Sequence, residues 1–194
     1  MQWHTYLERH DAWMQSDERT REEQFWMAPF EQGAPILELP LDKPRPAIRT
    51  FNGAHVLHQI PSTLLKQIEV TARSQRTTLF MTLFASYSVL LHRLTNQAEL
   101  IIGTPVSGRA MRGSEGLVGY GTHLLPILSR LPDPAQSFAD FLARTKQTLL
   151  PAYQHQRYPF GDLIEQLKLP LDHSRAALVS TVFNLEPPFP PFQM

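Results

Sequence analysis

Proline positions constrain the fold of this chain more than any other feature of its sequence. The chain has 17 prolines among 194 residues, and at about 9% this is well above the usual ~5%. Three of them fall within residues 40–46, and proline lacks the N–H that a helix interior or a central strand needs. We therefore expect residues 39–46 to form an extended connector lying across a surface.

Between the prolines, apolar residues recur at helical or strand spacing. Helices are expected over residues 11–30, 61–72, 79–94, 137–149 and 159–167, and strands over 54–60, 100–102, 124–131 and 178–185. The charged run 16–23 is expected to be a solvated helix face with i,i+4 pairs, and Ser137 is expected to be an N-cap. Residues 107–116 are expected to form a loop. The mixture of helices and separated strands predicts a layered α/β or α+β sandwich.

Composition excludes several functional classes. The chain has 18 basic and 18 acidic residues, so it lacks the basic patch typical of a nucleic-acid or membrane-surface binder. It has no cysteine, which excludes disulfides, thiolate nucleophiles and iron–sulfur clusters. No apolar run is long enough to span a bilayer, and the N-terminus does not resemble a signal peptide. We expect a cytoplasmic protein.

The residues alone do not assemble an evident catalytic or metal site. None of the eight histidines has the helical spacing of a zinc site, so no metal is expected. Ser107 lacks the glycine-flanked elbow of a serine nucleophile, and the glycines between 103 and 121 match no phosphate-binding loop. His123 follows a run of small residues and precedes an apolar strand, where it is either a structural histidine or a side chain reaching an opening.

Six segments, read in order, resemble the condensation domains of nonribosomal peptide synthetases. The two that carry most weight are IIGTPVSGR at 101–109, similar to GTPVxGR, and VGYGTHLLPI at 118–127, similar to VGxFVNTLPLR. The others are QFW at 24–26, LPLDKPRP at 39–46, HQRYPF at 155–160, and DHSR at 172–175 followed by VFN at 182–184. Together they cover nearly the whole chain.

The resemblance implies a fold and a reaction. Condensation domains consist of two lobes, each resembling chloramphenicol acetyltransferase, with a tunnel between them. Carrier proteins bring thioester-bound substrates on phosphopantetheine arms, and an acceptor amine attacks the donor thioester to form an amide. We expect an α/β two-layer sandwich of the chloramphenicol acetyltransferase type, a mixed sheet with helices packed on one face. No cofactor beyond the partners' phosphopantetheine is implied.

The family's catalytic element, HHxxxDG, is not present in this sequence. In the family it belongs to the N-terminal lobe, whereas the matched segments belong to the C-terminal lobe and the connector leading into it. We therefore interpret residues 1–46 as a helical and proline-rich connector and residues 47–194 as a truncated C-terminal lobe. No catalytic residue is assigned, and the chain alone is expected to be inactive.

The motifs carry over a small set of candidate site residues. Arg45 matches an arginine that salt-bridges the aspartate of HHxxxDG across the lobe interface, with Lys43 as its rival. Gly119, Tyr120, Gly121, His123 and Pro126 match the segment that lines the tunnel. His123 stands where the family usually has Asn, and Gly121-Thr122 replace a bulkier pair. These small residues are expected to widen the tunnel, and His123 could hydrogen-bond a substrate carbonyl.

The expected partners are the N-terminal lobe, acyl or peptidyl carrier proteins, and adjacent synthetase modules. A related enzyme that epimerises or forms esters is an alternative, and so is a catalytically silent binding module. An exposed apolar face around residues 120–127 and 178–185 predicts self-association of the isolated chain.

Overall fold

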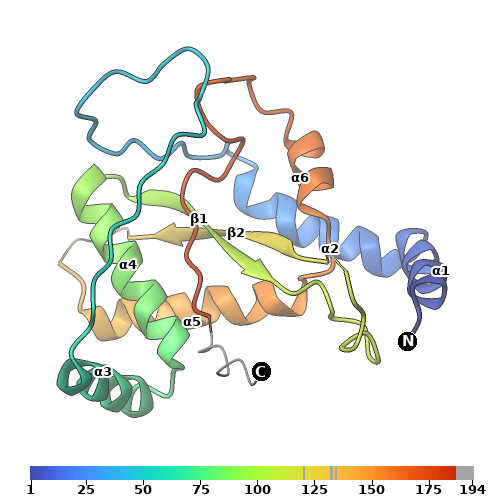
Figure 1. Cartoon of the computed structure of the whole chain (residues 1–194), viewed down its shortest axis with the longest axis horizontal. Helices are drawn as coiled ribbons and strands as arrows, with labels where there is room; N and C mark the ends of the chain where they lie inside the picture. The colour runs from blue at the N-terminus through green and yellow to red at the C-terminus, as the bar shows by residue number, and fades with distance from the viewer. Residues whose placement is uncertain (120, 132, 134, 187–194) are drawn as a thin grey trace, which may run out of the picture.

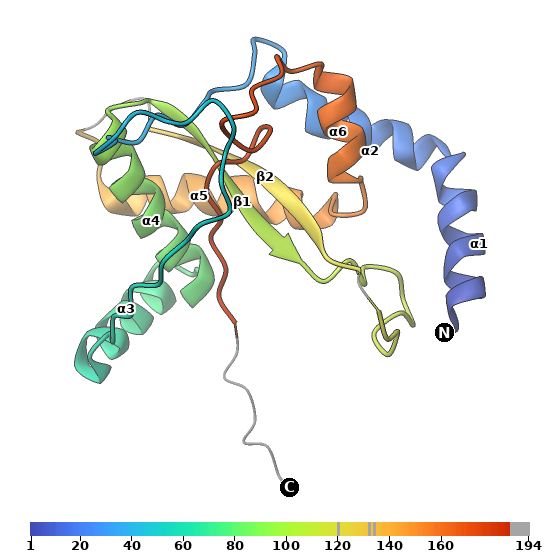
Figure 2. The same cartoon turned by 45° about the horizontal axis from the view of Figure 1, so that its top comes forward.

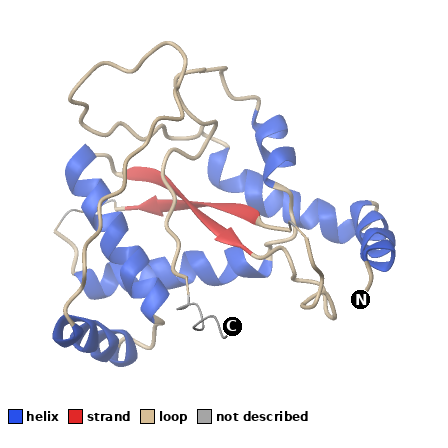
Figure 3. Cartoon of the chain, in the orientation of Figure 1, coloured by secondary structure: helices blue, strands red, loops and turns tan. Residues whose placement is uncertain are grey.

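A β-hairpin lies at the centre of the molecule, with helices packed around it (Figures 1 and 3). The computed structural model describes residues 1–119, 121–131, 133 and 135–186. The hairpin consists of β1 (Glu99–Val106) and β2 (His123–Arg130), which are antiparallel. The helices are α1 (Trp3–Met14), α2 (Asp17–Met27), a 3-10 turn (Ala28–Phe30), α3 (Ser62–Ser74), α4 (Leu79–Thr95), α5 (Phe138–Gln154) and α6 (Phe160–Leu167).

The hydrophobic core lies between the hairpin and helices α4 and α5. Phe84 of α4, Leu142 of α5 and Ile127 of β2 are each at most 2% exposed, so all three elements bury apolar side chains in one place. Buried His92 of α4 lies 3.1 Å through its Nε2 from Oγ of Ser129 on β2. The predicted α/β class is confirmed, with the helices and the strands forming separate layers.

The register of the hairpin explains why its prolines do not interrupt it. Gly103 uses its N–H and C=O to bond Thr181 and Phe183 on the side away from β2. Its partner Pro126 is therefore in a non-hydrogen-bonded pair, and so is Pro105, two residues along. A missing N–H removes no ladder bond at such positions. The expectation that the first strand covers only residues 100–102 is too short for this reason, since β1 continues through Pro105 to Val106.

Two further strand expectations are corrected. Residues 178–185 form only an isolated parallel bridge, between Val182 and Gly103, and Leu178 has a positive φ of 61° that breaks extended geometry before it. Because this bridge is parallel and the pairing with β2 is antiparallel, β1 has mixed pairing. Residues 54–60 form no strand: Val56 is 79% exposed and Leu57 93%, and no described residue pairs with this segment, which strand formation requires. Figure 1 shows the chain running down from the large loop to the start of α3 in this stretch.

The remaining helix expectations are confirmed with altered ends. The region expected to be one helix over 11–30 is two, because the chain breaks at Gln15 and Ser16. Arg19 and Glu23 make the expected i,i+4 pair at 2.8 Å, but Glu22 in the same run is only 3% exposed. Ser137 caps α5 as expected, accepting from the N–H of Asp140 at 3.1 Å.

Candidate functional site: a fixed loop beside the N-terminal helix

One arginine holds the loop that joins β1 to β2. The Arg109 guanidinium donates four hydrogen bonds to backbone carbonyls: two to Leu117 at 3.1 and 2.9 Å, one to Gly119 at 2.9 Å and one to Ser107 at 3.1 Å. These carbonyls lie in the two arms of the loop. Because the donor group is planar and rigid, it fixes both arms relative to each other and sets where the candidate segment 119–123 begins.

The two ends of this loop approach so closely that glycine is required. Gly108 has a positive φ of 64°, and a Cβ at this position would lie 1.6 Å from the carbonyl oxygen of Gly121 and 2.5 Å from the ring of His123. Any side chain at 108 would therefore collide with backbone and force an unfavourable conformation. The glycine thus allows the Gly121 carbonyl and the His123 ring to lie close to residue 108.

Helix α1 covers the other side of the same loop. The indole Nε1 of Trp3 donates to the carbonyl of Val118 at 2.8 Å, and the hydroxyl of Tyr6 donates to the carbonyl of Gly108 at 3.4 Å. Gly119 has a φ of 147°, and a Cβ there would come within 2.7 Å of the Trp3 ring. Gly119 is therefore in close contact with Trp3, and Figure 2 shows α1 beside the loop that follows β1.

His123, the first residue of β2, faces a small cavity between the loop and α1. The cavity is also lined by Tyr6, His10, Trp13 and Arg157. Burial lowers the pKa of His123, and the nearby His10 lowers it further. His123 is therefore neutral at pH 7, with one ring nitrogen available as a donor and the other as an acceptor.

The HQRYPF segment anchors α1 and α2 against the hairpin layer. Arg157 stacks over the Trp13 ring at 4.6 Å and pairs with Glu18 at 3.3 Å. The indole Nε1 of Trp26 donates to the carbonyl of His155 at 2.8 Å, and the ring of Phe25 stacks on that of His155 at 4.1 Å. The aromatic pair Phe25-Trp26 thus has a positioning role.

A salt bridge from α6 extends this anchoring. Arg19 pairs with Asp162 at 3.1 Å, and the hydroxyl of Tyr158 donates to Glu23 at 3.1 Å. Burial, followed by the charge of Glu23, raises the pKa of Tyr158 to about 12. Burial also raises the pKa of Glu22, which lies beside Glu23 on α2. Helix α2 is therefore held by these polar contacts as well as by Trp26.

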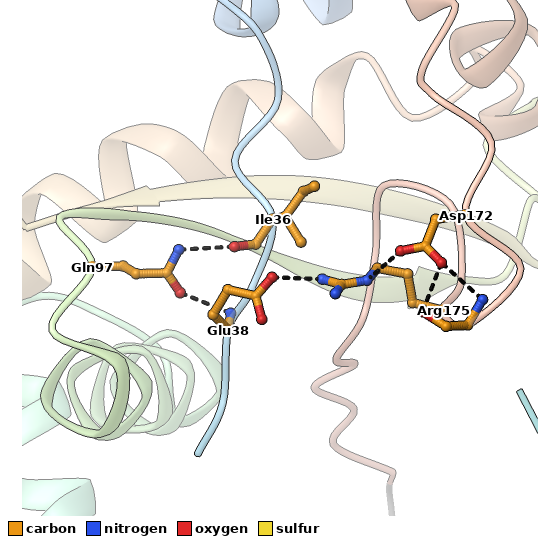
Figure 4. Close-up of polar contacts among 6 residues, drawn as sticks. Ile36, Glu38, Gln97, Asp172 and Arg175 are labelled. Atoms are coloured by element: carbon orange, nitrogen blue, oxygen red, sulfur yellow. Dashed lines mark hydrogen bonds and ion pairs between the residues drawn. The ribbon is translucent and has the colours of Figure 1, made fainter. Parts of the chain in front are cut away.

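The DHSR segment fixes the connector on the far side of β1 (Figure 4). Arg175 pairs with Glu38 at 2.9 Å and with Asp172 at 2.8 Å. The pKa of Asp172 is lowered, first by the hydroxyl of Ser174, which donates to it at 2.6 Å. Gln97 adds two bonds to the connector, one from its Nε2 to the carbonyl of Ile36 at 2.8 Å and one from the N–H of Glu38 to its Oε1 at 2.9 Å.

The remaining predicted site residues lie apart from this loop. Pro126 lines a separate groove of about 560 Å³ between β2, α2 and α5. Arg45 is half-buried; its Nε is covered, and neither a hydrogen bond nor an ion pair joins it to any described residue. Tyr120 lies outside the described residues. The structure therefore brings together Gly119, Gly121 and His123.

Sequence reasoning missed Arg109, Trp3 and Arg157 as the residues that hold the candidate segment. Arg109 and Arg157 lie inside quoted motifs, so their positions were available, but their bonds go to backbone carbonyls and side chains that no pattern identifies. Among the described residues, no three His, Asp or Glu side chains gather as a metal site would require. No described helix has the length and apolar character needed to cross a bilayer.

Sequence comparisons place relatives across almost the whole chain. The family profile described as "Condensation domain" matches residues 1–189. Tyrocidine synthase 3 of Brevibacillus parabrevis is 40% identical over 172 residues, which is 89% of this chain and 3% of that protein. Gramicidin S synthase 2 of Aneurinibacillus migulanus is 37% identical over 175 residues, 90% of this chain and 4% of that protein. The chain thus spans only a few per cent of these curated relatives.

Solved structures share the fold. A holo four-domain nonribosomal peptide synthetase bound to AMP and glycine aligns with a TM-score of 0.83 at 25% identity, over 88% of this chain and 13% of that one. The X-domain from teicoplanin biosynthesis aligns with a TM-score of 0.79 at 22% identity, over 93% of this chain and 40% of that one. At that identity the second likeness concerns the fold alone.

Proposed function

Since this chain belongs to the condensation-domain family, we propose that it forms the C-terminal lobe of such a domain in a nonribosomal peptide synthetase or hybrid polyketide–peptide synthase. Residues 1–46 would be the connector into this lobe and residues 47–194 the lobe itself. The observation that carries the proposal is the loop of residues 107–122. Arg109, Gly108 and α1 hold it so that Gly119, Gly121 and His123 form one wall.

The reaction would need little chemistry from this wall. The acceptor amine attacks the carbonyl carbon of the donor thioester; a C–N bond forms, the C–S bond breaks, and the thiol leaves on the pantetheine arm of the donor carrier protein. Positioning and exclusion of water supply much of such a rate enhancement. His123, kept neutral by burial, would hydrogen-bond a substrate carbonyl or amine. The proton-accepting histidines of HHxxxDG would come from the N-terminal lobe.

Arg45 is the proposed link between the lobes. Its half-buried guanidinium has a covered Nε without a partner among the described residues, and a buried charged donor without an acceptor is costly. An aspartate of the HHxxxDG segment would satisfy it. Arg45→Gln is expected to weaken association with the N-terminal lobe at least 10-fold. The exposed Lys43 is the matched control, and Lys43→Gln is expected to change association less than 2-fold by titration calorimetry.

The small residues at 121–122 are proposed to set acceptor preference. Gly121 does not have a positive φ, and its nearest contact for a Cβ is the Ser107 carbonyl at 3.3 Å, so a small side chain is sterically near its limit there. In the intact domain, Gly121→Ala and His123→Asn should shift the preference between a bulky and a small acceptor amine at least 5-fold. Unchanged preference in both variants would rule out a tunnel role for this segment.

The partner surface differs from the one that the sequence indicated. Leu125 and Ile127 are 1% and 2% exposed, because α4 and α5 cover that face of β2. These two residues therefore do not form the exposed apolar face that was expected, and self-association of the isolated chain stays a prediction. Val182 is 52% exposed, so the second part of the expected face stays open. Among the most exposed apolar side chains are instead two in residues 47–60, directly after the connector, where Phe51 is 89% and Leu57 93% exposed. We assign this stretch to contact with the N-terminal lobe.

Reconstitution tests the function. The chain is mixed with an N-terminal lobe from a family member, an acyl-loaded donor carrier protein and an aminoacyl-loaded acceptor carrier protein, and amide on the acceptor is measured by mass spectrometry. Amide is expected only when both lobes are present. Turnover by this chain alone would refute the division of labour. An ester formed with a hydroxyacyl acceptor would identify an ester-forming member, and an inverted stereocentre would identify an epimerising one. Carrier-protein binding without product would identify a catalytically silent member. A cytoplasmic location is proposed together with this function.

A further inference from the structure

The groove beside β2 runs along the edge of the strand. It is lined by the five consecutive residues from Pro126 to Arg130, with Phe25 and Trp26 of α2 on one wall and Phe141 and Arg144 of α5 on the other. Consecutive side chains of a strand point to opposite faces. A groove that touches all five must therefore follow the backbone edge.

That edge carries backbone groups that no described residue bonds. The pairing of Gly103 with Thr181 and Phe183 puts Pro126, and by alternation Leu128 and Arg130, in non-hydrogen-bonded pairs with β1. The free N–H and C=O groups of Leu128 and Arg130 therefore point into the groove. Leu128 is only 7% exposed, and unpaired backbone groups of a residue in such a position gain most from a partner.

We propose that this β2-edge groove binds an extended peptide of another polypeptide, which adds as a strand to β2. Such addition uses main-chain bonds for affinity and side-chain pockets for specificity. The aromatic walls would take apolar side chains at alternate positions. Arg144 is exposed and pairs with no described acidic residue, so a carboxylate is expected at the end of the peptide near it. A second copy of this chain is a poor occupant, because its own β2 is equally recessed between α2 and α5.

The probe is a fluorescein-labelled heptapeptide of alternating valine and threonine that ends in aspartate, titrated with the 194-residue chain. We expect binding at least 10-fold tighter than for the same peptide ending in lysine. Methylating the backbone nitrogens along one edge of the peptide should weaken binding at least 10-fold, and methylating those along the other edge should change it less than 2-fold. Arg144→Glu should reverse the preference between aspartate and lysine.

Two variants on α5 test the location. Thr148 lines the groove and is exposed, whereas Ala143 is exposed outside it, so Thr148→Trp should weaken binding at least 10-fold and Ala143→Trp less than 2-fold. Peptide binding should also slow amide exchange at Leu128 and Arg130. No saturable binding of the aspartate peptide below about 1 mM, or binding indifferent to both N-methylation patterns, would overturn the proposal.

Discussion

Two irregular segments of this molecule have opposite architectures. The loop of residues 107–122 is held by Arg109, by Gly108 packed on Gly121, and by bonds from α1. Residues 47–60, which follow the connector, make one backbone hydrogen bond to the rest of the described chain, from Arg49 to His173 at 2.9 Å. Phe51 there is 89% exposed. The first segment is positioned by this chain, whereas the second presents apolar side chains outward.

The difference separates two kinds of functional surface. A wall that must hold substrates needs a geometry fixed in advance. For the proposed wall, the Arg109 bond holds Gly119, and the close approach of Gly108 holds Gly121 and His123. An interface with a second lobe needs exposed apolar side chains that become covered on assembly, and residues 47–60 supply these. Under the proposed function, the first segment is a preformed substrate wall and the second is an interface that becomes covered on assembly.

The largest effect is expected from Gly108→Ala. The added Cβ would meet the Gly121 carbonyl at 1.6 Å in a backbone with φ of 64°, so unfolding should become easier by about 3–5 kcal/mol. Urea denaturation measures this. Gly116 has open space and no positive φ, so Gly116→Ala should change stability by less than about 0.5 kcal/mol. Equal effects at the two glycines would mean that the loop is not closely packed.

Arg109→Ala should have the next largest effect. It removes four donors from the carbonyls of Leu117, Gly119 and Ser107, and because the site is partly exposed the cost should be about 2 kcal/mol. Arg112 lies in the same loop and makes no hydrogen bond to a described residue. Arg112→Ala is therefore the control, with an expected change below about 0.5 kcal/mol. A negligible loss at Arg109 would show that α1 alone holds the loop.

The pH dependence of stability should include two histidines, buried His92 and half-buried His123. Burial lowers the pKa of both His123 and His92, so in the folded state each takes up its proton at lower pH than the unfolded value of about 6.5. Their stabilisation is complete above about pH 6.5 and is lost as the pH falls toward the folded-state pKa.

His123→Asn should remove part of this slope. As the pH is lowered from about 7.5 to about 5.5, the variant should lose less stability than the parent, because the unfolded parent gains a proton at His123 that the folded parent does not accept. For one proton, the slope against pH can differ by at most about 1.4 kcal/mol per pH unit. The residual slope would include His92 and, with the opposite sign, Glu22, whose pKa burial raises. Parallel curves for parent and variant in urea denaturation series would contradict the assigned burial of His123.

The smallest effect is expected in residues 47–60. Leu57 is 93% exposed, so Leu57→Ser should change the stability of the chain by less than about 0.5 kcal/mol. Leu100→Ser, at a position with 0% exposure, should cost about 3 kcal/mol or more by comparison. In the presence of the N-terminal lobe, Leu57→Ser should weaken association at least 5-fold. An unchanged affinity would remove residues 47–60 from the proposed interface.

Local patterns predicted much of the fold and less of the site. The apolar period over residues 79–94 and the cap at Ser137 act within a few residues, so the sequence determines them directly. The strand at 100–102 was predicted too short, because whether Pro105 breaks a ladder depends on register, which lies outside the segment. The same holds for residues 54–60, whose alternation is a strand signal only when a neighbour pairs with it.

The site shows the same limit. Family motifs indicated Gly119, Gly121 and His123, and their proximity follows from the hairpin that joins both arms of the loop. Trp3 lies 115 residues from Val118, to which it bonds, and no spacing rule connects such positions. Pro126 is grouped with the loop because it belongs to the same family motif, but the strand carries it to the β2-edge groove.

Hydrogen–deuterium exchange of this chain, alone and with an N-terminal lobe, tests the central contrast most directly. Amides of residues 107–119 that lie under Arg109 and α1 should exchange slowly in the chain alone and change little on addition of the lobe. Amides of residues 47–60 should exchange at nearly the unfolded rate in the chain alone and slow at least 10-fold in the complex. Fast exchange of the loop amides in the lone chain, or unchanged exchange at residues 47–60 when the lobe is added, would contradict the account.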